Sequence, residues 1–395
     1  MTAVFQELDA QLSHVENDLI SLRRHLHAHP ELSNFEFETS SHLISRLRDM
    51  GFVITARPEG TGFFADLTPE GFDPGRHKTV AIRCDLDALP IEEMTQLPFE
   101  SKAPGVMHAC GHDMHMTVAT GVGMVLKSMP LNGRLRLVYQ HAEEAVPGGA
   151  LAMIELGAME GVDFMLGMHV DPELEVGKIG VKDGAFTAAF DTFSIRVIGK
   201  SGHGARPHHC VDPIFVLTQL ANALYNSVGR SFDARDPMVF SIGQIGGGHA
   251  PNIIPDDATM KGSIRTLSKA HRDLVEPTLV RICDGVCDTY GAQYELDLLR
   301  GAPAIVNDST VSAAIATAGV DALGADNVYR IPLPSMGSED FSHYLSHAPG
   351  AMFRLGVARP GEPKYFLHSA RFAPDEKALG IGVRTLARAA LSLMG

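Results

Sequence analysis

Three shortages in the 395-residue sequence narrow the classes of protein to which it can belong. Only five cysteines are present, few and odd in number, which argues against a disulfide framework and predicts a reducing compartment. No uninterrupted apolar run is long enough to span a membrane. The first residues are acidic and lack the basic start of a secretory signal. We therefore expect a cytoplasmic protein.

Basic residues are scarce as well. The sequence has 33 lysines and arginines but 47 aspartates and glutamates, so the net charge is −14 with histidine neutral. This balance repels nucleic acid and anionic lipid, and no basic run offsets it, so we expect neither partner. The 19 histidines are the compositional excess. Such an excess indicates either metal binding or scattered surface histidines, and the positions of the residues have to decide between the two.

Length and periodicity predict two domains, one inserted into the other. Alternating helix and strand patterns over residues 1–184 predict an α/β catalytic domain, a mixed sheet with helices on both faces. Residues 185–297 change to a β-α-β-β-α-β order, which predicts a smaller α+β domain, and the α/β pattern returns over 298–395. In the α/β part we expect strands at 77–86, 134–140 and 163–170, and helices at 116–129, 148–156 and 374–393.

Side chains that bind metals recur where the predicted strands end. Each has an ordinary alternative, because carboxylates at strand ends usually cap helices and a lone histidine is seldom a ligand. In open α/β sheets, however, the carboxyl ends of the strands face a common crevice in which ligands bind, so the conjunction predicts a metal site. The residues concerned are Asp85 and Asp87, the run His108–His115 (HACGHDMH), Glu143 and Glu144, His169 and His368.

Nine motifs in a constant order extend this pattern over most of the chain. They are Arg24–Leu32 (RHLHAHPEL), Asp85–Pro90 (DLDALP), His108–His115, Ala142–Ala150 (AEEAVPGGA), Gly199–Pro207 (GKSGHGARP), Gly246–Asp256 (GGGHAPNIIPD), Gly262–Arg265 (GSIR), Met336–Phe341 (MGSEDF) and His368. With them the chain resembles the amidohydrolase branch of the aminoacylase and glutamate-carboxypeptidase metallopeptidases, which includes hippurate and indoleacetyl-amino-acid hydrolases. The resemblance implies a phosphorylase/hydrolase-like catalytic domain with an inserted ferredoxin-like lid and dimerisation domain.

The resemblance also implies a metal centre and its chemistry. Two divalent ions (zinc, manganese, nickel or cobalt) are expected, and five protein ligands leave positions for a water and the substrate. Glu143 is expected to act as general base and acid. Asp87 and Asp113 are expected to orient ligand histidines. For Asp85 two roles are possible, a metal ligand or a residue that orients a ligand histidine. The implied ligands are Cys110, His112, Glu144, His169 and His368.

In the inserted domain, the resemblance assigns three further residues. His203 is expected to reach the active site of a partner subunit and stabilise an oxyanion, which implies a homodimer; its ordinary alternative is a histidine in a glycine-rich turn. Asn252 and Arg265 match positions that hold a substrate carboxylate, a task to which the arginine fork is suited. The expected substrate is an N-acyl amino acid.

Two departures from the family pattern and several alternatives stay open. His141 stands where relatives usually have proline, and His249 adds an imidazole to a glycine-rich loop, so these departures bear on the substrate and not on the chemistry. A metallo-dipeptidase or a desuccinylase of the same family, a cysteine hydrolase using Cys110 with His112, and a non-catalytic metal-binding protein are the alternatives. The other cysteines, Cys84, Cys283 and Cys287, are expected to be packing residues.

Overall fold

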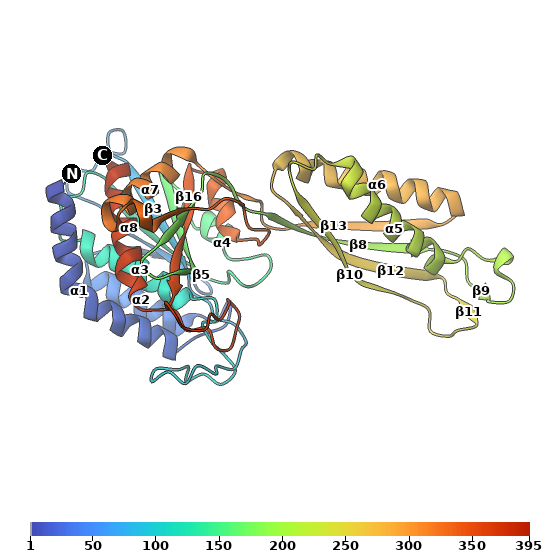
Figure 1. The fold of residues 1–395 in the computed structure, drawn as a ribbon, viewed down its shortest axis with the longest axis horizontal. Coiled ribbons are helices and arrows are strands. Elements are labelled where there is room, and N and C mark those ends of the chain that lie inside the picture. Colours follow the sequence, from blue (N-terminus) through green and yellow to red (C-terminus); the bar gives the residue numbers. More distant parts are fainter. Residues whose placement is uncertain (1) are drawn as a thin grey trace. The chain divides into compact units, whose positions relative to one another are not determined.

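The computed structural model describes residues 2–395, which divide into two compact units (Figure 1). Unit 1 contains residues 2–186, Val306–Leu333 and Asp340–Gly395. Unit 2 contains Thr187–Ile305 and Pro334–Glu339. Within the described residues, every helix is too short or too polar to cross a membrane.

Unit 1 is built on an eight-stranded mixed sheet in the order β1-β2-β4-β3-β5-β16-β6-β15. The central strands β4, β3, β5 and β16 are parallel, whereas β1 and β2 pair antiparallel at one edge. Every residue of β3 is buried, as expected for a central parallel strand covered on both faces. The strands are β1 (Val53–Ala56), β2 (Phe63–Leu67), β3 (Thr79–Asp85), β4 (Arg134–Gln140), β5 (Phe164–Glu175), β6 (Ile179–Val181), β15 (Val328–Arg330) and β16 (Gly350–Ala358).

Helical segments cover both faces of this sheet. Two adjacent residues of β4 contact helical segments on opposite faces. The Tyr139 hydroxyl bonds Thr120 of α3 at 2.8 Å, and the next side chain, Gln140, accepts a hydrogen bond from Tyr344 of η3 at 3.0 Å. Successive strand residues point to opposite faces, so α3 and η3 lie on opposite sides. The helical segments are α1 (Thr2–Ala28), α2 (Phe37–Asp49), α3 (His112–Leu126), α4 (Ala150–Glu155), α7 (Ser309–Leu323), η2 (Ala325–Asn327), η3 (Asp340–Ser346) and α8 (Ala378–Met394).

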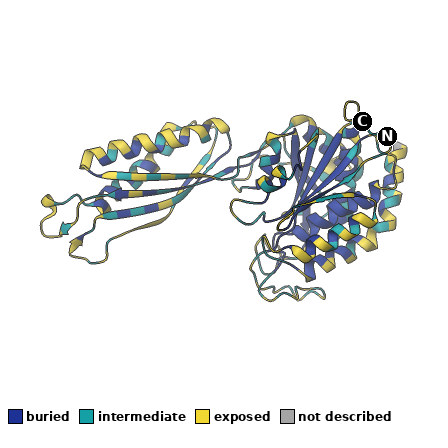
Figure 2. Ribbon diagram, turned by 180° about the vertical axis from the view of Figure 1, so that it is seen from behind, coloured by how far each residue is buried: buried dark blue, intermediate teal, exposed yellow. Residues whose placement is uncertain are grey.

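The α/β class and the mixed sheet with helices on both faces are thereby confirmed. Strand β4 has the predicted bounds, but α3 begins at His112 rather than at residue 116. Gly111 precedes it with a left-handed φ of 83°, which lets the helix begin inside the polar run. All fifteen residues of α3 are buried, and Figure 2 shows the buried sheet beside the exposed outer helices.

Unit 2 is a four-stranded antiparallel sheet, in the order β10-β12-β8-β13, that packs against two helices. Strand β8 alternates buried and less buried residues, so Phe193, Ile195 and Val197 contribute to the core as its alternating sequence predicts. The elements are β8 (Ala189–Ile198), β9 (Gly202–His203), η1 (Pro207–His209), α5 (Pro213–Ser231), β10 (Met238–Gly247), β11 (Ile253–Ile254), β12 (Asp257–Thr266), α6 (Lys269–Tyr290) and β13 (Gln293–Arg300).

Unit 2 is larger than the predicted insertion of residues 185–297. The chain passes between the units near β7 (Gly184–Thr187) and β14 (Ile305–Asn307), and residues 334–339 return to unit 2. There the Gly337 carbonyl accepts a hydrogen bond from the Ala188 amide at 2.9 Å. Such a pairing between distant segments leaves no periodic signal in the sequence. The lid and dimerisation roles of this unit stay predictions.

Candidate metal centre

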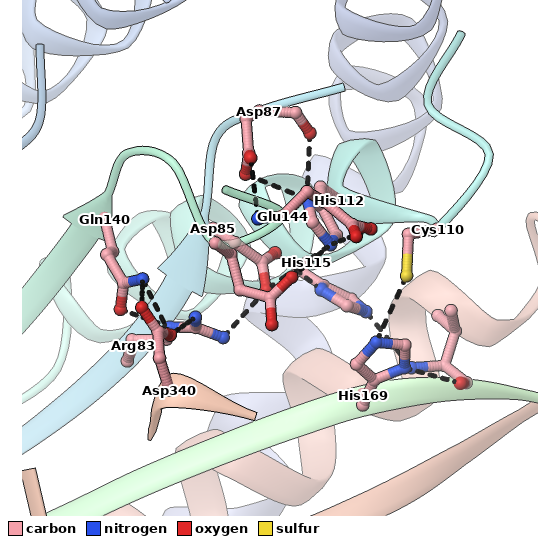
Figure 3. A network of polar contacts seen from close by, with 12 residues as sticks. Arg83, Asp85, Asp87, Cys110, His112, His115, Gln140, Glu144, His169 and Asp340 are labelled. Carbon is pink, nitrogen blue, oxygen red and sulfur yellow. Dashed lines mark hydrogen bonds and ion pairs between the residues drawn. The ribbon is translucent and has the colours of Figure 1, made fainter. Parts of the chain in front are cut away.

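Three neighbouring parallel strands of unit 1 deliver polar side chains to the same edge of the sheet. Asp85 ends β3 and Asp87 follows it, the segment after β4 carries Glu144, and His169 lies in β5. His112 joins them from the first turn of α3. Figure 3 shows these side chains pointing toward one another. The convergence follows from topology, because parallel strands end at one edge.

Unusual backbone conformations shape the turns that present these side chains. Gly111 lies against Val170, and a Cβ at this glycine would lie 2.6 Å from the Val170 Cγ2 atom, so no larger residue fits. Ala142 and His368 have left-handed φ values of 50° and 64°. Non-glycine residues seldom adopt this conformation, and when they do it is often at functional sites.

All five predicted ligands come together in unit 1. The Cys110 sulfur lies 3.5 Å from His169 Nε2, and His368 Nε2 lies 3.2 Å from Glu144 Oε1. Glu143, the predicted base, joins the same cluster. Three overlapping groups have ligand atoms within 4.8 Å of one another: Cys110, His112 and His169; Cys110, Glu144 and His368; and His112, Glu143 and Glu144.

The two central histidines present Nε2 to the cluster. His112 Nδ1 donates to the Asp87 carbonyl at 2.8 Å, and His169 Nδ1 donates to the Val170 carbonyl at 2.8 Å. A carbonyl only accepts, so Nδ1 carries hydrogen in both rings. His112 Nε2 is buried and has no hydrogen-bond partner in the described part of the chain. A buried nitrogen without a partner, surrounded by a thiol, imidazoles and carboxylates, fits a divalent cation.

Burial and neighbouring charges shift the pKa values in this cluster. Burial raises the pKa of the Cys110 thiol. Burial opposes charge on His112, but the Asp85 carboxylate raises the pKa of that imidazole well above its ordinary value. Burial also opposes ionisation of Glu144, yet the neighbouring His368 imidazole lowers the pKa of its carboxyl. A metal ion binds the thiolate of Cys110 and the neutral ring of His112, so protons compete with it and affinity should fall at low pH.

Two carboxylates after β3 support the cluster in different ways. Asp87 accepts a hydrogen bond from the Glu144 amide at 2.9 Å, and its Oδ1 lies 3.3 Å from His112 Nδ1. Asp85 accepts from His115 Nδ1 at 2.7 Å, while His115 Nε2 accepts from the Val170 amide at 3.1 Å. Both ring nitrogens of His115 are thus engaged, which leaves no lone pair for a metal. Asp85 lies in a supporting position beside it.

Asp113 requires a correction, because its contacts differ from the expected support of a ligand histidine. Its Oδ2 atom accepts from Arg23 Nε at 2.9 Å and from His27 Nδ1 at 2.8 Å. Both partners belong to α1, which packs against α3. Asp113 therefore ties the first turn of α3 to α1.

Two buried side chains, Glu36 and His141, form hydrogen bonds at the segment that carries Glu143 and Glu144. Glu36 accepts a hydrogen bond from the Ala142 amide at 2.8 Å. His141 Nε2 accepts from Arg57 Nη1 at 2.8 Å, and burial, together with Arg57, lowers the pKa of His141 to about 4. The extra imidazole at 141 is thus a neutral acceptor for Arg57. Glu36 lies 106 positions from Ala142, so no local pattern pairs them.

The other predicted residues lie in unit 2. His203 of β9 pairs with Ile253 of β11, and the Asn252 carbonyl accepts from the Gly204 amide at 2.9 Å, so His203 and Asn252 lie in neighbouring segments. Arg265 does not lie in these neighbouring segments. It lies near the far end of β12, donates to the Met336 carbonyl at 2.8 Å and stacks on Phe190. His249 lies in the loop after β10.

Comparisons with known proteins agree with this geometry. A family profile described as Peptidase family M20/M25/M40 matches residues 81–392. The chain is 44% identical over 375 residues to a Synechocystis protein named "Probable hydrolase sll0100", covering 94% of each. It is 41% identical over 304 residues to the N-acyl-L-amino acid amidohydrolase of Geobacillus stearothermophilus, covering 76% of this chain and 81% of that protein. The solved YXEP protein of Bacillus subtilis, described as a dinuclear metal binding peptidase, superposes with a TM-score of 0.84 at 34% identity, covering 97% and 99%.

Proposed function

Since the chain belongs to the peptidase family M20/M25/M40, we propose that it is a metal-dependent amidohydrolase that cleaves the amide bond of N-acyl amino acids. The observation that carries the proposal is the convergence of the five ligand side chains with Glu143 beside them. The amidohydrolase name of the Geobacillus relative supports the substrate class. Acetyl and benzoyl groups are the first acyl groups to consider.

Cys110, His112, Glu144, His169 and His368 would hold two divalent ions. The buried, unpartnered Nε2 of His112 and the orientation of His169 support this assignment. When bound, such ions lower the pKa of a water molecule and polarise the substrate carbonyl. Asp87 orients both His112 and Glu144, because its backbone carbonyl accepts from the His112 ring and its carboxylate accepts from the Glu144 amide.

Glu143 would move the proton. Its Oε2 atom lies 3.9 Å from His112 Nε2, so the carboxylate faces the cluster. There it accepts a proton from the attacking water, whose oxygen bonds to the carbonyl carbon. It then gives the proton to the amine nitrogen as the C–N bond breaks. Glu144, the next residue, is available as a ligand because neighbouring side chains point in different directions.

His203, Asn252 and Arg265 are proposed to act on the substrate. His203 Nδ1 accepts a hydrogen bond from the Ala205 amide at 3.0 Å, so the hydrogen of the ring is on Nε2. That hydrogen suits donation to an oxyanion of a partner subunit in a homodimer. The second guanidinium nitrogen of Arg265 suits a substrate carboxylate.

A cysteine hydrolase is less well supported. A nucleophilic cysteine needs a thiolate, which a lowered pKa provides. Burial instead raises the pKa of Cys110, and the hydrogen bond and charge of His112, its partner in that reaction, only partly offset the rise, so the thiol form is favoured. Chelation separates the two reactions, because a thiol nucleophile works without metal.

The test is amine release from acetyl-, benzoyl- and indoleacetyl-amino acids, measured after chelation and again after manganese or zinc is restored. We expect chelation to abolish the activity and metal to restore it. Glu143→Gln should retain bound metal while turnover falls by about 10² to 10⁴. Glu155→Gln, an exposed change of the same kind, is the matched control. Activity that survives chelation would support Cys110, and a metal-loaded enzyme inactive on every N-acyl amino acid would refute the substrate class.

A further inference from the structure

A histidine cluster separate from the candidate metal centre lies where the end of α1 meets α2. It consists of His25, His29 and His42, and we call it the α1–α2 histidine cluster. The ring centroid of His25 lies 4.6 Å from that of His29 and 4.3 Å from that of His42. No residue of this cluster belongs to the groups described above. It accounts for part of the histidine excess that the metal centre leaves unexplained.

The cluster lines a groove of about 560 Å³ on unit 1. His25 lies in the last turn of α1, and His29 follows directly after the helix, where its amide donates to the Leu26 carbonyl at 3.2 Å. His42 comes from the neighbouring helix α2. The exposed carboxylate of Glu38 lines the same groove and offers an oxygen ligand. Glu31 is already engaged, since it accepts hydrogen bonds from the Glu38 and Thr39 amides.

The hydrogen bonding and the pKa shifts of the cluster are compatible with a metal ion. His29 Nδ1 donates to the His25 carbonyl at 2.8 Å, so Nε2 is the nitrogen left to contact a ligand. Burial, followed by the charges of His42, His29 and Lys102, lowers the pKa of His25. Burial, Arg46 and His29 likewise lower the pKa of His42. The lowered pKa values of His25 and His42 favour their neutral forms, and neutral imidazoles are preferred ligands of zinc, copper and nickel.

We propose that His25, His29 and His42 form a second site for a divalent transition-metal ion that bridges α1 and α2. The two ring pairs are stacked or tilted, with interplanar angles of 27° and 36°. Binding of one ion by all three rings requires rotation about their side-chain torsions, so that the nitrogens turn toward a common point. Because the ion binds only the folded arrangement of the two helices, it stabilises unit 1. The site is independent of the proposed catalytic centre.

The experiment compares zinc binding by two triple variants. His25→Gln/His29→Gln/His42→Gln removes the cluster, and His14→Gln/His208→Gln/His209→Gln removes three exposed histidines elsewhere. Equilibrium dialysis against Zn²⁺, followed by metal analysis, counts the ions bound per chain. We expect the cluster variant to bind one ion fewer than the wild type. The control variant and the wild type should bind equal numbers.

Thermal unfolding with zinc and a single-residue variant also test whether the cluster binds metal. Added zinc should raise the Tm of the wild type and of the control, but raise that of the cluster variant less. If the triple variant fails to fold, His42→Gln alone should weaken the site by about tenfold or more. Equal zinc stoichiometry in the cluster and control variants, or an unchanged affinity in His42→Gln, would overturn the proposal. Amide hydrolysis should persist in the cluster variant, which separates this site from the catalytic one.

Discussion

Replacing Glu36 with alanine tests whether a buried carboxylate holds the segment that carries the proposed base. Glu36 has no exposed surface. It accepts hydrogen bonds from the Ala142 amide at 2.8 Å and the Asn34 amide at 3.0 Å, and from the Thr61 hydroxyl. Ala142, in its left-handed conformation, immediately precedes Glu143. Loss of the carboxylate should therefore loosen this turn.

The magnitude follows from the donors that are left behind. The Ala142 amide and the Thr61 hydroxyl belong to residues that are only 3% and 2% exposed, so water cannot replace the carboxylate at either. Each buried donor without a partner costs about 1–3 kcal/mol, which sums to roughly 2–6 kcal/mol. Removing a buried charge offsets part of this. We expect a loss of about 3 kcal/mol in the free energy of unfolding of Glu36→Ala, and a smaller loss in Glu36→Gln.

The assay is urea unfolding followed by circular dichroism, together with kcat and KM on the best N-acyl amino acid. We expect kcat of Glu36→Ala to fall by about tenfold or more, because the base is misplaced, with little change in KM. Glu59→Ala, an exposed change, should stay within about 0.5 kcal/mol of the wild type. A Glu36→Ala variant as stable and as active as Glu59→Ala would refute the reasoning.

Three further predictions concern stability and reactivity. Arg83→Met leaves two buried carboxylates without their cation and should lower the free energy of unfolding in urea by about 3–5 kcal/mol. Arg196→Met breaks only exposed pairs and should leave the urea midpoint almost unchanged. Burial opposes charge on His27, but its hydrogen-bonded carboxylate partner raises the net pKa, so its stabilisation is complete below about pH 6.5 and is lost as pH rises through the folded pKa. His27→Gln should thus destabilise the protein more at about pH 6 than at about pH 9, and an equal effect at both would contradict this. Burial raises the pKa of Cys283 to about 12, so peptide mapping should find iodoacetamide on the partly exposed Cys210 first.

Local sequence patterns determine most of the secondary structure. The run Arg134–Gln140 forms β4 with the predicted bounds, and Lys269–Tyr290 forms α6. Both follow from side-chain periodicity, which acts between residues two to four positions apart. The start of α3 was harder to predict, because its first turn is polar and Gly111 begins it through a backbone conformation.

The contacts of individual carboxylates depended on packing instead. Asp113 is next to the predicted ligand His112 in the sequence and Asp87 is 25 positions from it, yet Asp87 contacts His112 whereas Asp113 pairs with Arg23, 90 positions away. The partner of Asp113 is set by how α1 packs on α3, which no spacing near Asp113 records. The same holds for Glu36, whose partner Ala142 follows a strand in the middle of the sheet.

The sequence by itself determined the family resemblance, the α/β class and the set of metal-capable side chains, because these depend on residue type, order and short-range period. The tertiary structure decided which of those side chains meet. It placed Cys110 3.5 Å from His169, engaged both nitrogens of His115, and stacked His25 on His42. Such distances arise from the pairing of strands and the packing of helices across tens of residues, where a single sequence carries no periodic signal.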